Sequence, residues 1–278
     1  MFDKAIEDLF NSNDVVSDPI PFQPYITKIG LKKNVKTADF ISINDISQLR
    51  PELKENKCTV LRLGGGIGGY TRFSLVRMDS WDDYFLREKK LFHNDFSAEK
   101  ITLSKDFLFP FTMVENLSET ALVNLCLGSG ILYHALELDD KNQILPFTTR
   151  GTYTFNFQPS NRSKKILDHV NGQIEIDSIF VAKRKGKKSL FVIEAKSDKT
   201  DNLSKHKILY PILAISKNIP NDLDVVPVYI RIKKNELGYS FHIAECSISS
   251  KDENFGALSE VKPKKIYEQE IQLKSSFY

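Results

Sequence analysis

The sequence is poor in cysteine and has no long apolar run, and these two absences exclude several classes of protein. Three of its 278 residues are cysteine (Cys58, Cys126 and Cys246), and no two of them form a CxxC pair. We therefore expect neither a disulfide framework nor a thiolate zinc site, and a reducing compartment, the cytoplasm, is the natural location. No apolar run approaches the roughly 20 residues needed to span a bilayer. The acidic stretch at residues 1–8 lacks the features of a secretory signal peptide.

Histidine patterns that bind zinc are also missing. The five histidines show neither an HxH nor an HExxH spacing, so a zinc site built on them is not expected. The net charge of +3 discriminates little between classes of protein, but the charges are unevenly distributed. Residues 181–217 contain ten Lys or Arg and three Asp or Glu. This stretch is a candidate contact for a nucleic-acid backbone, although a charge run at a turn is also typical of a solvated surface.

A glycine-rich segment at positions 64–69 (GGGIGG) formally matches the dinucleotide-binding pattern GxGxxG. The match fails on context, because a strand-like segment follows the glycines where a phosphate-binding helix is required. The preferred interpretation is a hairpin loop between strands at residues 59–63 and 70–76. Because Arg62 and Arg72 flank the loop, contact with a phosphate backbone stays open as an alternative.

The pattern after residue 114 predicts an α/β fold. Helical periodicity covers residues 115–137, with Asn116 or Ser118 as the cap. The segments that follow are predicted as a strand at 149–157, a loop or short helix at 160–172, strands at 173–181 and 190–196, a helix at 203–216 interrupted at Pro211, and strands at 225–231 and 239–244. This order indicates a mixed β-sheet flanked by helices. We place the domain boundary so that an N-terminal α+β segment, with a further strand at 41–43, covers residues 1–113 and the second domain covers 114–278.

Charged residues interrupt two apolar, β-branched runs in the second domain. Asp177 lies in the run at 173–181, and Glu194 and Lys196 lie in the run at 190–196. Side chains alternate across a strand, and the short basic turn at 183–188 joins the two runs. We therefore expect Asp177, Glu194 and Lys196 on one side of a hairpin. Glu175 shares a strand face with Asp177 and is an alternative or additional acid.

Two carboxylates and an ammonium group in one place suit the hydrolysis of a phosphodiester. Asp177 and Glu194 supply hard oxygen ligands for Mg²⁺, with Mn²⁺ as a substitute, and the backbone carbonyl of Ala195 is a further candidate ligand. The metal would polarise the phosphate and activate a bound water, and Lys196 would orient that water or stabilise developing charge. The alternative interpretation is a set of ordinary surface charges on an exposed hairpin.

The spacing Asp177-x16-Glu194-x-Lys196 on consecutive strands resembles the PD-(D/E)XK nuclease superfamily, and in particular its type II restriction-endonuclease-like subgroup. The segments 173–177 (QIEID), 193–197 (IEAKS) and 209–211 (LYP) carry the same resemblance. It implies a restriction-endonuclease-like core that cleaves DNA. It also implies an additional acidic residue on the preceding helix, for which Glu119 is the candidate.

The sequence departs from the superfamily pattern at two places. Ile176 stands where a proline often precedes the first catalytic acid. His206 or Lys207 lies where related sequences often carry a glutamine, one turn before Tyr210. The second departure puts in doubt a role for the position of His206 or Lys207.

We therefore predict a Mg²⁺-dependent endonuclease of the type II restriction kind that acts on double-stranded DNA as a homodimer, with a cognate DNA methyltransferase encoded nearby. A structure-specific or repair nuclease and a non-catalytic DNA-binding protein that retains the fold are the alternatives. The candidate catalytic residues are Asp177, Glu194, Lys196 and Glu119. The candidate nucleic-acid contacts are Lys183, Arg184, Lys185, Lys187, Lys188, Lys199 and Arg72.

Overall fold

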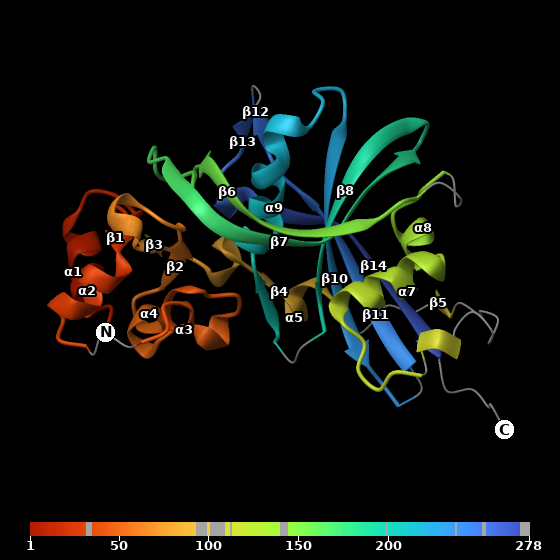
Figure 1. Ribbon diagram of the computed structural model, residues 1–278, viewed down its shortest axis with the longest axis horizontal. Coiled ribbons are helices and arrows are strands. Elements are labelled where there is room, and N and C mark those ends of the chain that lie inside the picture. The colour runs from red at the N-terminus through yellow and green to blue at the C-terminus, as the bar shows by residue number, and fades with distance from the viewer. Residues whose placement is uncertain are drawn as a thin grey trace.

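A mixed sheet of seven strands is the largest element of the computed structural model, which describes residues 1–31, 35–92, 99–100, 109–111, 113–139, 144–197, 200–236, 238–251 and 254–272. Its strand order is β5-β14-β11-β10-β8-β7-β6 (Figure 1). Strands β8 and β10 run parallel, as do β14 and β5, and the other neighbours run antiparallel. The strands are β5 (Glu99–Lys100), β6 (Phe147–Phe157), β7 (Leu167–Arg184), β8 (Lys187–Lys196), β10 (Asp224–Lys234), β11 (Gly238–Ser247) and β14 (Lys262–Gln272).

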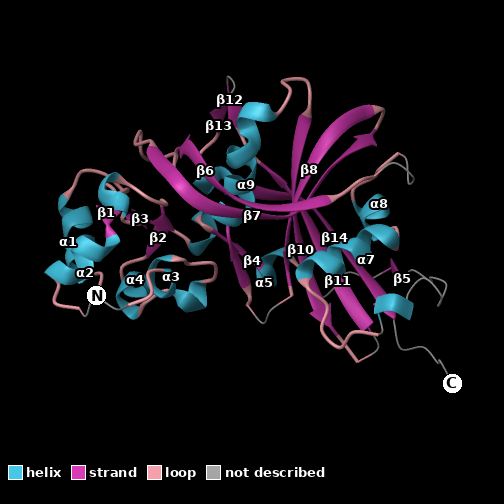
Figure 2. Ribbon diagram, in the orientation of Figure 1, coloured by secondary structure: helices cyan, strands magenta, loops and turns pink. Residues whose placement is uncertain are grey.

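Helices cover both faces of this sheet, which confirms the predicted α/β class (Figure 2). Helix α9 (His206–Ile215) packs on one face, and α7 (Glu119–Gly128) and α8 (Ile131–Ala135) pack on the other. Strand β8 shows why its sequence reads as a continuous apolar run. Val192 faces the cluster that contains α9, and Phe191 faces the cluster that contains α7 and α8. A strand buried on both faces needs apolar residues at successive positions.

The predicted hairpin between the two charged strands is confirmed. Strands β7 and β8 pair antiparallel from Ser178↔Ile193 to Arg184↔Lys187. Lys185 and Gly186 close the turn with φ values of 52° and 77°, the backbone that a two-residue turn between twisted strands requires. The backbone N–H groups of both turn residues donate to the carboxylate of Asp139, at 2.9 and 2.7 Å. These two bonds help to hold Lys185 in a conformation that is unfavourable for a residue with a side chain.

The two predicted helices are present, but the first is divided into two helices and the second is continuous. The helix predicted at 115–137 is divided into α7 and α8, because Gly130 adopts the left-handed conformation with φ 82°. The Ser118 hydroxyl caps α7 by accepting a hydrogen bond from the Ala121 N–H at 3.2 Å. Helix α9 continues through Pro211, where an interruption was predicted. Buried neighbours on both sides of this proline, among them Ile212, hold the helix against the sheet.

Several predicted boundaries were wrong. Strand β7 begins at Leu167, although residues 160–172 were predicted as loop or short helix; polar side chains there alternate with buried ones and pair with β6. Strand β14 was not predicted, since lysines and glutamates occupy much of it. Residues 41–43 do not form a strand, because α3 ends at Ile41 and the next residues are irregular.

The N-terminal segment combines short helices with a three-stranded sheet of order β1-β3-β2 at one end of the molecule (Figure 1). The predicted hairpin is confirmed, since β2 and β3 pair antiparallel around the glycine-rich loop. The elements are α1 (Asp3–Asn11), β1 (Ile20–Pro21), α2 (Phe22–Lys28), α3 (Ala38–Ile41), α4 (Pro51–Glu55), β2 (Cys58–Arg62), β3 (Arg72–Arg77), β4 (Phe85–Arg87) and α5 (Glu88–Leu91). Two small sheets are formed by β4 with β9 (Asn202–Ser204) and by β12 (Ser250–Lys251) with β13 (Asn254–Phe255). Short 3₁₀ turns occupy Ile46–Gln48, Ile67–Gly69, Trp81–Asp83, Ser216–Asn218 and Leu258–Glu260.

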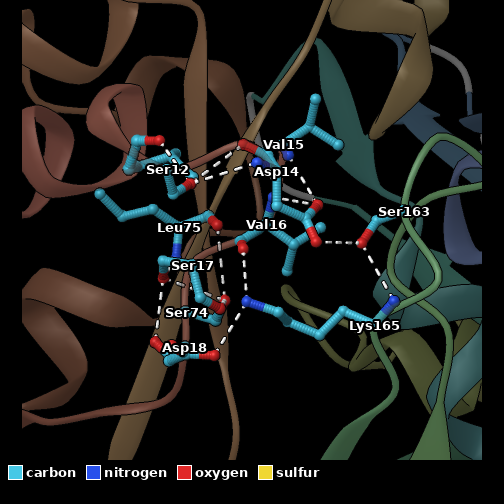
Figure 3. A network of polar contacts seen from close by, with 11 residues as sticks. Ser12, Asp14, Val15, Val16, Ser17, Asp18, Ser74, Leu75, Ser163 and Lys165 are labelled. Atoms are coloured by element: carbon cyan, nitrogen blue, oxygen red, sulfur yellow. Dashed lines mark hydrogen bonds and ion pairs between the residues drawn. The ribbon is translucent and has the colours of Figure 1, made fainter.

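Polar contacts tie the N-terminal segment to the loop between β6 and β7 (Figure 3). The Ser163 hydroxyl donates to the Asp14 carboxylate at 2.9 Å, and the Lys165 ammonium donates to the Val16 carbonyl at 2.9 Å. Lys165 also pairs with Asp18 at 2.8 Å. One buried apolar cluster continues from α1 to α9, so the core crosses the boundary predicted at 113–114. That boundary stays a prediction. Within the described part of the chain, no helix has the length and apolar character needed to cross a membrane.

Gly64 provides a test of the contact between the glycine-rich loop and β7. Its φ is 71°, and a Cβ added there would lie 2.3 Å from the Val170 carbonyl oxygen. Gly69 has a similar φ of 76° with nothing within 4 Å of such an atom. We expect Gly69→Ala to cost only the left-handed strain of about 1–2 kcal/mol. Gly64→Ala should cost about 1–3 kcal/mol more, because the backbones must separate. Urea unfolding measures both, and equal losses would show that the contact does not matter.

Candidate functional site

The candidate site lies where β7 and β8 stop pairing. Their ladder ends at Ser178↔Ile193, while β8 continues beside β10 as far as Lys196↔Arg231. At this point the Ala195 N–H donates to the Asp177 carboxylate at 2.8 Å. A side chain of β7 thus accepts a bond from the β8 backbone just beyond the end of the ladder. The separation of the strands leaves the Asp177 carboxylate next to the charged residues at the end of β8.

The Lys196 ammonium joins the other predicted groups. Its Nζ lies 3.1 Å from Glu194 Oε1 and 3.2 Å from Glu119 Oε2, and it donates to the Ala195 carbonyl at 2.9 Å. Glu119 stands in the first turn of α7, and its second carboxylate oxygen accepts from the Ser197 N–H at 3.0 Å. Glu194 is only 3% exposed. The Lys196 ammonium therefore contacts three oxygens, one from α7 and two from β8.

The proximity of these groups shifts the pKa values of Asp177 and Lys196. Burial raises the pKa of Asp177 to about 7, and the negative charge of Glu194 acts in the same direction. Burial alone would lower the pKa of Lys196, but the carboxylates of Glu194, Glu119 and Asp177 together raise it above its ordinary value. Three acidic side chains, of which Glu194 is buried, thus lie near the Lys196 ammonium, and groups with such perturbed pKa values are common at functional sites.

The carboxylate and carbonyl oxygens of the site are the type of ligand that a hard divalent cation prefers. No three His, Cys, Asp or Glu side chains form a ready metal cluster in the described ranges. Three of the candidate ligand oxygens, from Glu119, Glu194 and the Ala195 carbonyl, contact the Lys196 ammonium instead. Glu194 Oε1 has no partner in hydrogen-bond geometry among the described residues, although it is buried. A cation bound by carboxylate and carbonyl oxygens would satisfy it.

Lys207 is a site neighbour whose role the sequence left in doubt. Its Nζ lies 3.6 Å from Glu194 Oε1, so α9 adds a second positive charge near the buried carboxylate. The position one turn before Tyr210 was the signal that pointed to it. Glu175, the alternative acid, is exposed on β7 two residues before Asp177. The hydrogen bond to the Ala195 N–H is made by Asp177.

The predicted nucleic-acid contacts that the structure describes are either exposed lysines or residues that pair with a carboxylate. Lys183, Lys187 and Lys188 are exposed near the β7–β8 turn. Strand β7 ends before this turn at Arg184, seven residues after Asp177, which corresponds to roughly 23 Å along a strand. Arg184 pairs with Glu245 at 2.6 Å. The other three candidates are Lys185, which pairs with Glu137 at 3.1 Å, Arg72, which pairs with Asp168 at 2.8 Å, and Lys199, which lies outside the described residues.

Fold and site together define an α/β protein with a buried cluster of acids and one lysine at the divergence of two central strands. The chain belongs to a family described as a domain of unknown function (DUF6997), whose profile matches residues 88–267. That range contains all four candidate catalytic residues and begins with Glu88 of α5. Comparisons with curated proteins and with solved structures gave no match.

Proposed function

We propose that this chain is a metal-dependent nuclease that hydrolyses phosphodiester bonds of DNA at the site formed by Asp177, Glu194, Lys196 and Glu119. The observation that carries the proposal is the contact of one half-buried ammonium with two carboxylates and a carbonyl, beside a third carboxylate where the two strands diverge. The resemblance of the Asp177-x16-Glu194-x-Lys196 spacing to PD-(D/E)XK nucleases supports the same reading.

Each residue of the site has a role that follows from its contacts. Asp177, Glu194 and the Ala195 carbonyl would hold Mg²⁺ or Mn²⁺, which supplies charge neutralisation and a water of lowered pKa. Lys196 is fixed by the oxygens around it and presents a donor to negative charge that develops on the phosphate. Glu119 holds both Lys196 and the Ser197 N–H, so it orients the end of β8.

The finer parts of the proposal concern substrate and assembly. Double-stranded DNA is the proposed substrate, and a homodimer would place two sites on its two strands. The exposed lysines near the β7–β8 turn would contact phosphates away from the cut. A restriction role would pair the enzyme with a DNA methyltransferase encoded nearby.

Metal dependence is the direct test of this function. Supercoiled plasmid incubated with the purified protein should be cut in Mg²⁺ or Mn²⁺ and should stay intact in EDTA, because the carboxylates cannot neutralise a phosphate without the cation. Discrete bands would indicate sequence-specific cutting, and cleavage confined to branched oligonucleotides would indicate a structure-specific nuclease. Intact plasmid, branched DNA and RNA in both metals would show that the proposal is wrong.

A further inference from the structure

A small cavity lies between the N-terminal segment and the sheet, next to the candidate site. Its volume is about 240 Å³, below the roughly 300–1,000 Å³ usual for pockets that bind drug-sized ligands. Asn44 and Arg62 line it from the N-terminal segment, His169 lines it from β7, and His206 and Tyr210 line it from α9. A cavity of this size and lining suits one small planar group.

Tyr210 lines this cavity and carries a buried hydroxyl that makes no hydrogen bond among the described residues. The side chain is 4% exposed, and its hydroxyl has no hydrogen-bond partner among the described residues. The ring is held by aromatic neighbours, with the Phe155 ring centre 5.2 Å and the Phe157 ring centre 5.0 Å from its own. A buried hydroxyl without a partner costs stability. A ligand in the cavity would supply the missing partner.

Two histidine side chains line the cavity, and neighbouring groups hold both of them in place. The His169 ring stacks on Phe155 with centres 4.7 Å apart, and a Cβ at Gly172 would lie 1.9 Å from its Nε2. Burial lowers the pKa of His169 to about 4 and that of His206 to about 3. At neutral pH both imidazoles are therefore neutral. Flat neutral rings beside amide and hydroxyl groups match the faces and edges of a nucleobase, and the charged side chains of Arg62 and Lys207 in the same lining suit the phosphate attached to it.

The cavity adjoins the candidate site through Lys207. This residue lines the cavity, and its Nζ lies 3.6 Å from Glu194 Oε1. A nucleotide whose base occupied the cavity would thus have its sugar and phosphates close to the buried carboxylates. Arg62, which also lines the cavity, donates to Ser42 at 2.9 Å and comes from outside the range matched by the family profile.

We infer that this cavity binds a single nucleobase, unstacked from the strand and placed beside the phosphate to be cut. The inference rests on the proposed function for its nucleic-acid ligand. The close approach of Gly172 to His169, the stacked imidazole and the unpartnered hydroxyl pre-organise the cavity for one planar ring. Because part of its wall belongs to the N-terminal segment, that segment contributes to the choice of nucleotide. A base within a strand and the base of a free nucleotide present the same chemistry.

Binding measured in EDTA separates this inference from the cleavage reaction. Labelled homo-oligonucleotides of each base are compared with an abasic oligonucleotide of the same length by fluorescence anisotropy. Nucleoside 5′-monophosphates are titrated by calorimetry as the second arm. We expect at least one homo-oligonucleotide to bind about tenfold tighter than the abasic one. Tyr210→Phe should reduce that preference severalfold, because only the hydroxyl is lost. Tyr239→Phe, on the opposite face of the sheet, should leave it unchanged.

The outcomes of the two arms are distinct. A base preference that depends on Tyr210 supports a base held within a strand, and such dependence for monophosphates alone supports a free nucleotide as the ligand. Equal preferences in wild type and Tyr210→Phe, in both arms, overturn the inference even if the enzyme cuts DNA. Conversely, base binding that depends on Tyr210 in a protein that never cuts would leave the inference standing and remove the proposed nuclease activity.

Discussion

Replacement of Asp177 by asparagine is expected to reduce Mg²⁺-dependent DNA cleavage by about 10³-fold, since a catalytic metal contributes several kcal/mol and each 1.36 kcal/mol is worth a factor of ten. Asparagine has nearly the shape of aspartate, and its carbonyl can still accept the bond from the Ala195 N–H. The lost quantity is therefore the negative charge near Glu194. Single-turnover cleavage of labelled DNA measures the effect, with binding followed separately by anisotropy.

The free energy of unfolding shows whether Asp177→Asn loses cleavage because a negative charge is missing or because the fold is damaged. Asp177 and Glu194 are acidic neighbours in a buried site, so their repulsion opposes folding when no cation is bound. The Asp177→Asn protein should consequently unfold at the same or a higher urea concentration than wild type. A variant that loses both cleavage and stability would indicate a structural role for the carboxylate.

Two further carboxylates serve as matched comparisons for Asp177. Asp224 is exposed at the start of β10, and Asp224→Asn should leave cleavage unchanged. Glu175→Gln decides between the two candidate acids of β7. Full activity in Asp177→Asn together with a large loss in Glu175→Gln would assign the metal-binding acid to Glu175 and contradict the role proposed for Asp177.

The sequence predicted the charged part of the site because that part is local. Asp177, Glu194 and Lys196 interrupt two apolar runs joined by a tight turn, and a hairpin has one simple way to pair such runs. Glu119 came only from resemblance, since its contact with Lys196 spans 77 residues of sequence. Strand alternation predicted only which face of the strand carries Asp177. It did not predict that the Asp177 carboxylate would accept a hydrogen bond from the Ala195 N–H.

The cavity could not be predicted from the sequence, for reasons that are also physical. It is built from loops near residue 44, the end of β2, the extension of β7 and the first turns of α9, which meet only in the folded chain. Residues 167–172 were expected to be irregular, because polar residues and Gly172 obscure the alternation there. Their pairing with β6 supplies the order that local propensity does not.

Glu88→Ala is expected to lower the free energy of unfolding by about 3–5 kcal/mol, the usual loss when one partner of a buried ion pair is removed. Glu88 is 4% exposed. It accepts from the Tyr229 hydroxyl at 2.6 Å and pairs with the Arg231 guanidinium at 3.2 Å. Burial raises the pKa of Glu88, whereas Tyr229 and Arg231 favour its charged form. The variant removes the buried carboxylate that both the Tyr229 hydroxyl and the Arg231 guanidinium contact.

Two companion variants make the Glu88 result specific. Glu55→Ala removes an exposed carboxylate from α4 and should change the free energy of unfolding by less than about 0.5 kcal/mol. Glu88→Gln should fall between wild type and Glu88→Ala, because an amide can accept from Tyr229 but carries no charge for Arg231. Glu88 also joins α5 to β10 across the boundary predicted at 113–114. A loss as small as that of Glu55→Ala would mean that residues near α5 add little to the sheet, whereas the full loss would make them part of its cooperative unit.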